Sequence, residues 1–124
     1  MTTEQIEAIY EMVNAVYYKK VKLVDAMAIM PKKYGVNRNS FADYYRAFQK
    51  MLDGELHTRS IGTDLRIYYL NMIYKHYGPN KLKIALDAYM GSIIYYEETH
   101  NTNRKIERDI HKRFSNLIDK WHNG

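Results

Sequence analysis

Apolar residues recur every three or four positions along almost the whole of this 124-residue chain, and no segment alternates apolar with polar residues. A spacing of three to four places side chains on one face of an α-helix, whereas a half-exposed strand alternates with a period of two. No Asn-Gly or Asp-Gly turn joins two strand-like runs. The sequence therefore predicts an all-α fold, a single compact domain of about six helices spanning residues 1–124.

Gly, Pro and polar residues separate the expected helices. Pro31 lacks a backbone N–H and is expected to disturb the second helix after Met30, and Gly35 stops the chain in a turn. Gly78 ends one helix and Pro79 opens the next. The expected helices span about residues 4–18, 22–30, 37–53, 64–77, 79–98 and 103–121, and either Asn37 or Asn39 can cap the third of them.

Apolar stripes indicate which helix faces should be buried. The inward stripe of the third helix comprises Phe41, Tyr45, Phe48 and Leu52. The stripe of the last helix comprises Ile106, Ile110, Phe114, Leu117 and Trp121. We expect residues 22–53 to form a helix-turn-helix-like unit and residues 60–121 to supply the C-terminal helices.

The positive charge is concentrated in two blocks. Residues 19–66 hold ten basic and five acidic side chains, and residues 101–124 hold six against three, in a chain of net charge +5. A basic block attracts polyanions by releasing their counterions, although it also serves simply as a solvated surface. Tyrosine is also enriched, with 13 Tyr against 3 Phe. Its hydroxyl suits half-buried rims of an interaction surface, without indicating which partner binds there.

The turn after the second predicted helix resembles that of a DNA-binding helix-turn-helix. Gly35 permits a left-handed backbone, Val36 fills the angle between the helices, and Asn37 can cap the next helix. Phe41 and Tyr45 then attach that helix to the core. A plain helical hairpin needs the same turn, cap and apolar stripe, so both interpretations stay open.

The remaining face of the third predicted helix is polar and basic. Arg and Asn near the start of a helix are the residue types that read guanine and adenine edges in a major groove. Arg59 follows in the loop 57–60, where hydroxyls and backbone N–H groups could hold a phosphate or simply cap the next helix. The candidate nucleic-acid-binding residues are Asn37, Arg38, Asn39, Ser40, Asp43, Tyr44, Arg46, Lys50 and Arg59. On the last helix, Arg104, Arg108 and Lys112 share a face that could follow a DNA backbone or keep the chain soluble.

The turn has a short echo later in the chain. The pattern K-x-Y-G-x-N-[RK]-x-x-[FI]-A occurs at residues 32–42 and again at residues 75–85, an offset of 43 positions. Duplication of a helical hairpin and convergent turn chemistry both explain it, because Gly and Asn are common at helix ends.

The order of these signals from about residue 5 to residue 114 resembles a known family. The matching pieces are KYGVNRNSFADY (33–44), MLDG (51–54), HTRS (57–60), YYL (68–70), YG (77–78) and IYYE (94–97). They are similar to an N-terminal helical domain found ahead of HNH nuclease modules in bacterial restriction-type endonucleases. The resemblance implies a module that binds or selects DNA for an attached nuclease, in a restriction or phage-defence system. The sequence itself contains no HNH motif.

We find no residues that predict catalysis or a cofactor. The chain has no cysteine, its five histidines are scattered, and no Gly-rich phosphate loop occurs. Glu107 and His111 are too few ligands for zinc, which takes three or four. The acidic N-terminus is unlike a signal peptide, and no apolar run approaches the ~20 residues that span a bilayer. The expectation is a cytoplasmic protein without enzymatic activity, metal or cofactor.

The leading hypothesis is a non-catalytic module that binds double-stranded DNA, plain or modified. The alternative is an adaptor or inhibitor that binds a partner protein through Tyr-rich helical surfaces. A third hypothesis, an oligomerisation domain that could form a homodimer, requires the stripe from Ile106 to Trp121 to stay unburied within one chain.

Overall fold

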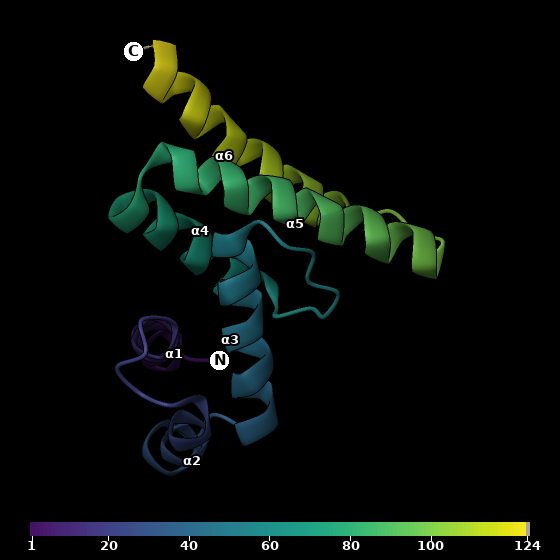
Figure 1. The fold of residues 1–124 in the computed structure, drawn as a ribbon. Coiled ribbons are helices and arrows are strands. Elements are labelled where there is room, and N and C mark those ends of the chain that lie inside the picture. The colour runs from purple at the N-terminus through teal and green to yellow at the C-terminus, as the bar shows by residue number, and fades with distance from the viewer. Residues whose placement is uncertain (124) are drawn as a thin grey trace. The chain divides into compact units, whose positions relative to one another are not determined.

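The computed structural model describes residues 1–123 and is all-α, as the apolar periodicity predicts (Figure 1). Within those residues there are six helices and no strand. The helices are α1 (Thr3–Tyr17), α2 (Leu23–Tyr34), α3 (Arg38–Asp53), α4 (Thr63–Tyr77), α5 (Pro79–His100) and α6 (Lys105–Asn123). Contacts between residues divide the chain into two compact units, residues 1–49 and the residues from Lys50 onward, so the division falls inside α3.

The first unit contains α1, α2 and most of α3. Thr2 begins α1 with a capping box, in which its hydroxyl accepts from the Gln5 N–H and the Gln5 side chain accepts from the Thr2 N–H. The same Gln5 side chain donates to the carbonyl of Tyr34, which ties the start of α1 to the end of α2. Phe48 on α3 meets the rings of Tyr10 and Tyr17 edge to face.

Pro31 does not end α2, contrary to the sequence prediction. The helix continues through it to Tyr34 and ends at Gly35, which adopts a left-handed conformation with φ of +68°. The N–H groups of Gly35 and Val36 bond to the carbonyls of Pro31 and Met30, so the last turn remains closed. Pro31 removes one donor near the end of the helix, whereas Gly35 supplies the backbone geometry that a helix end requires.

The second unit is built from α4, α5 and α6 with the last turn of α3. Helices α5 and α6 lie side by side, and α4 contacts both of them (Figure 1). Leu65, Tyr69, Leu82 and Phe114 are among the residues buried between these helices. Lys81 on α5 donates to the carbonyl of Leu52, which holds the end of α3 against α5.

Two predicted stripes need correction. On α6 the buried side chains are Ile110, Phe114 and Ile118, whereas Ile106 and Trp121 are 68% and 60% exposed and Leu117 is half-buried. Glu107 takes the inward position beside Ile106, because the hydroxyl of Tyr89 on α5 donates to its carboxylate. The middle of the stripe is therefore buried within one chain, contrary to what the oligomerisation hypothesis requires. On α3, Phe41, Phe48 and Leu52 are buried as predicted, but Tyr45 is half-buried.

The repeated turn sequence builds two different joints. Gly35 has φ of +68° and ψ of +21°, and two further residues follow before α3 begins. Gly78 has φ of +87° and ψ of 177°, and α5 begins at the very next residue, Pro79. The ring of Pro79 fixes the φ of a first helical residue, which Val36 at the corresponding position does not do. This difference favours convergent turn chemistry over a duplicated hairpin.

Candidate nucleic-acid interface

The joint between α2 and α3 has the local geometry that its sequence predicts. Gly35 is left-handed, Val36 is buried, and α3 begins at Arg38. The side-chain oxygen of Asn37 accepts from the backbone N–H groups of Asn39 and Ser40, at 2.9 and 3.1 Å. Asn37 is therefore the helix cap, and its oxygen is occupied by the backbone.

The first turn of α3 presents Arg38 and Asn39 to solvent. Both side chains are exposed, whereas Ser40 is half-buried. The turn contains no acidic residue, so the positive end of the helix dipole and the Arg38 charge have the same sign. This end of α3 attracts anions electrostatically.

Farther along α3, one acidic residue interrupts the basic face. Arg46 is exposed, and its guanidinium lies 3.7 Å from the carboxylate of half-buried Asp43. A pair of this length near the surface contributes little stability, so Arg46 can turn toward another anion at small cost. Tyr44 and Lys50 are half-buried. From Arg38 to Lys50, the seven predicted residues on α3 thus follow one another along a single helix.

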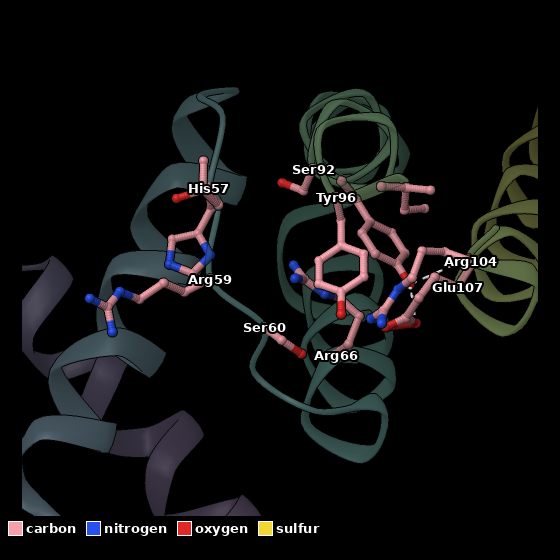
Figure 2. Close-up of a pocket in the computed structure, with 11 residues that line it drawn as sticks. His57, Arg59, Ser60, Arg66, Ser92, Tyr96, Arg104 and Glu107 are labelled. Carbon is pink, nitrogen blue, oxygen red and sulfur yellow. Dashed lines mark hydrogen bonds and ion pairs between the residues drawn. The ribbon is translucent and has the colours of Figure 1, made fainter. Parts of the chain in front are cut away.

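Arg59 is the one predicted residue that lies outside α3 and the joint before it. It belongs to the second unit, on the loop that leads into α4, and lies on the lining of a pocket there. Its guanidinium points away from the paired side chains of Arg104 and Glu107 (Figure 2).

The same pocket contains an arginine that is not among the residues predicted from the sequence. Arg66, on α4, is only 5% exposed. Its guanidinium lies 4.5 Å from the centre of the Tyr89 ring, and one of its N–H groups points to the sulfur of Met51 at 3.1 Å. Burial lowers the pKa of Arg66, although a guanidinium keeps its proton in proteins. The helical spacing of Arg66, Leu70 and Ile73 indicates that Arg66 is buried, because residues at i, i+4 and i+7 share a helix face.

Glu107 balances part of this positive charge. Its carboxylate accepts from the Tyr89 hydroxyl at 2.8 Å and pairs with Arg104 at 3.1 Å. The Arg104 guanidinium also lies 4.2 Å from the centre of the Tyr96 ring. Figure 2 shows Arg66, Tyr96, Arg104 and Glu107 converging on one space. Burial, followed by the bond to Glu107, raises the pKa of Tyr89, which therefore remains protonated.

The expected basic row on the last helix is not a free row of charges. Arg104 precedes the helix and pairs with Glu107, and Arg108 donates through two nitrogens to the carboxylate of Glu97 on α5. The Arg104 backbone N–H bonds to the same carboxylate at 2.8 Å. The Arg108 guanidinium and this N–H lower the pKa of Glu97 to about 2.

No three His, Asp or Glu side chains among residues 1–123 are grouped so that they could share a metal ion. Over the same residues, no helix combines the length and the apolar character needed to cross a bilayer.

Comparisons with known proteins give no match: no protein-family model, curated protein sequence or solved structure is similar to this chain. The resemblance to the helical domain of HNH-type restriction endonucleases therefore stays a prediction.

Proposed function

We propose that this chain is a non-catalytic module that binds duplex DNA through the amino-terminal half of α3. The observation that best supports this proposal is the exposed pair Arg38 and Asn39 in the first turn of a capped helix. Such a helix end can enter a major groove, where Arg binds the O6 and N7 atoms of guanine and Asn binds the N6 and N7 atoms of adenine. The restriction or phage-defence setting rests on the family resemblance alone.

The capping bonds of Asn37 divide the predicted site into two roles. The Asn37 side chain caps the start of α3. The side chains of Arg38 and Asn39 do not cap the helix and can reach base edges. Arg46 and Lys50 lie one turn apart on the same helix, at positions suited to phosphate oxygens. Lys32 and Lys33 at the end of α2 add two more exposed charges near the turn.

The proposal is tested by fluorescence anisotropy with labelled duplex DNA, first selected from a random pool and then compared with unselected sequence. Binding should weaken steeply between 50 and 200 mM salt, with a slope of log K against log salt of roughly −0.9 for each phosphate contact. Arg38→Ala or Asn39→Ala should weaken the selected site by about 1–3 kcal/mol and unselected DNA much less. Lys50→Ala should weaken both alike and reduce the salt slope by about 1.

Lys112→Ala provides the matched control, because it removes an exposed positive charge from α6 and leaves α3 intact. It should change binding to selected and unselected DNA by much less than Arg38→Ala does. If Arg38→Ala and Lys112→Ala weaken binding equally, the chain binds DNA through diffuse charge and α3 reads no sequence. If the wild-type chain binds no duplex even at 50 mM salt, the proposed function is wrong.

A second candidate function, binding of a partner protein, is favoured by an apolar strip on the second unit. Ile84, Gly91 and Tyr95 lie on one face of α5, and Leu56 lies beside Gly91. Leu56, Ile84 and Tyr95 are each 40–46% exposed. Only two of the 13 tyrosines are exposed, Tyr18 and Tyr95, so this strip is more aliphatic than Tyr-rich. Sedimentation velocity at rising concentration, with Ile84→Glu as the variant, tests whether a second copy of the chain covers it.

A further inference from the structure

We infer that the pocket around Arg66 and Arg104 in the second unit is a binding site for one small oxyanion of the phosphate class. The site is separate from the α3 surface proposed to bind DNA and does not depend on that proposal. It is lined by the loop 57–60, by α4 and α5, and by the residues at the start of α6 (Figure 2).

The guanidinium of Arg66 carries a buried positive charge. The Arg66 residue is only 5% exposed. Among residues 1–123, no carboxylate lies within ion-pair distance of its guanidinium. Its contacts are a thioether sulfur and the face of the Tyr89 ring, neither of which carries a negative charge. A buried cation is costly unless an anion pairs with it and accepts its N–H groups. An anion in the adjoining space would supply both.

The side chains that line the pocket carry more positive than negative charge. Three guanidinium groups line it, those of Arg59, Arg66 and Arg104, against the single carboxylate of Glu107. That carboxylate is already engaged by the Tyr89 hydroxyl and by Arg104. Arg66 therefore remains without a paired carboxylate among residues 1–123, and a single monoanion or dianion would offset its charge. Arg is suited to this role because its planar fork of N–H groups matches the oxygens of phosphate.

Neutral hydrogen-bond donors also line the pocket. Thr58 and Ser60 stand on the loop that lines the pocket, and both are exposed. The Ser60 oxygen accepts from the Gly62 N–H at 3.4 Å, which leaves its O–H able to donate. Hydroxyls of this kind complete the shell around a phosphate oxygen that guanidinium groups do not reach.

The volume of the pocket limits the ligand to a small group. About 30 Å³ is left between the side chains. That exceeds the ~10–15 Å³ required by one water and is far below the ~300–1,000 Å³ of pockets that hold drug-sized molecules. A single compact oxyanion, or the terminal phosphate group of a larger molecule, matches this space, whereas a nucleobase or a dinucleotide cofactor does not.

The test is isothermal titration of the full chain with inorganic phosphate at constant ionic strength, with chloride as the reference anion. Phosphate should bind with a stoichiometry of one and raise the melting temperature with the logarithm of its concentration once that concentration exceeds the dissociation constant. Arg66→Gln should weaken phosphate binding about 10- to 100-fold, because it removes a charge-assisted interaction. Arg104→Gln should also weaken phosphate binding. Because Arg104 is less buried than Arg66, this variant still tests the site if Arg66→Gln misfolds.

Two further variants separate an anion site from a merely structural cluster. Glu107→Gln removes the only carboxylate that lines the pocket and leaves Arg104 without its ion pair, so phosphate should bind more tightly than to the wild type. A purely structural cluster would lose stability on this change without gaining affinity for phosphate. Arg113→Gln removes an exposed charge from α6 outside the pocket and should leave phosphate binding unchanged. Unchanged phosphate binding in Arg66→Gln and Arg104→Gln, or no binding by the wild type, would overturn the inference.

The source of the phosphate is resolved by competition. A short oligonucleotide with a 5′-phosphate and the same oligonucleotide with a 5′-hydroxyl are each titrated against bound inorganic phosphate. Displacement by the first alone identifies the end of a nucleic acid strand as the ligand, and displacement by neither identifies the free anion. These experiments need no duplex binding at α3, so their failure is distinguishable from failure of the proposed DNA-binding function.

Discussion

Removing the Asn37 side chain should uncap α3 and lower the stability of the first unit. Asn37→Ala removes the oxygen that accepts from the N–H groups of residues 39 and 40, at 2.9 and 3.1 Å. Loss of such a cap typically costs ~1 kcal/mol, with a range of about 0.5–2 kcal/mol. Asn37→Gly should cost only a few tenths of a kcal/mol, and Asn37→Ser should retain the cap.

The size of the melting shift depends on how much of the chain unfolds together. At roughly 2.1 cal/mol/K per residue, unfolding of all 124 residues has an entropy of about 0.26 kcal/mol/K, so the cap loss lowers the melting temperature by about 4 °C. If residues 1–49 unfold alone, the entropy is about 0.1 kcal/mol/K and the shift is about 10 °C. Differential scanning calorimetry measures the shift and distinguishes these two cases.

Asn39→Ala is the matched comparison, because Asn39 is exposed two positions later and its side chain makes no capping bond. It should leave the melting temperature nearly unchanged and weaken selected DNA, whereas Asn37→Ser should preserve both stability and DNA affinity. Equal melting temperatures for Asn37→Ala and Asn39→Ala would refute the capping argument. Loss of DNA affinity in a stable Asn37→Ser variant would show that Asn37 contacts DNA directly.

Two further predictions concern a glycine and an ion pair. Gly35→Ala should destabilise the chain by about 1 kcal/mol because of the positive φ of +68°, and not because of crowding, since the atom nearest to an added Cβ is 3.8 Å away. Gly91→Ala, within a helix, should stabilise the chain by about 0.5–1 kcal/mol. Urea denaturation should therefore give changes of opposite sign for the two variants. The pKa of Glu97 is lowered from 4.5 to about 2, so its contribution to stability is complete above pH 4.5 and is lost as the pH falls toward 2. Arg108→Gln should raise the Glu97 pKa toward 4.5, which carboxyl-carbon NMR titration measures directly; an unmoved titration would contradict the assignment of Arg108 as the main cause.

The helices and the first joint could be predicted from the sequence because their causes are local. Apolar spacing extends over one or two turns, and a left-handed glycine followed by a capping Asn involves residues within five positions. The predicted end of α2 at Pro31 is wrong, because a proline removes only one backbone hydrogen bond, whereas Gly35 sets the helix end. The exposed face of α3 follows from the same local spacing.

Which polar residues are buried depends on how the helices pack together. Arg66 and Glu107 are 41 positions apart in the sequence, and their burial depends on Tyr89 from a third helix. Helical periodicity allowed either Ile106 or Glu107 to face inward on α6, and the hydroxyl of Tyr89 favours the carboxylate. A charged residue is stable inside a protein only when distant groups compensate it, and no local pattern records where those groups will meet. Local sequence thus specifies the helices and the basic face of α3, whereas the arginine pocket exists only through the packing of α4, α5 and α6.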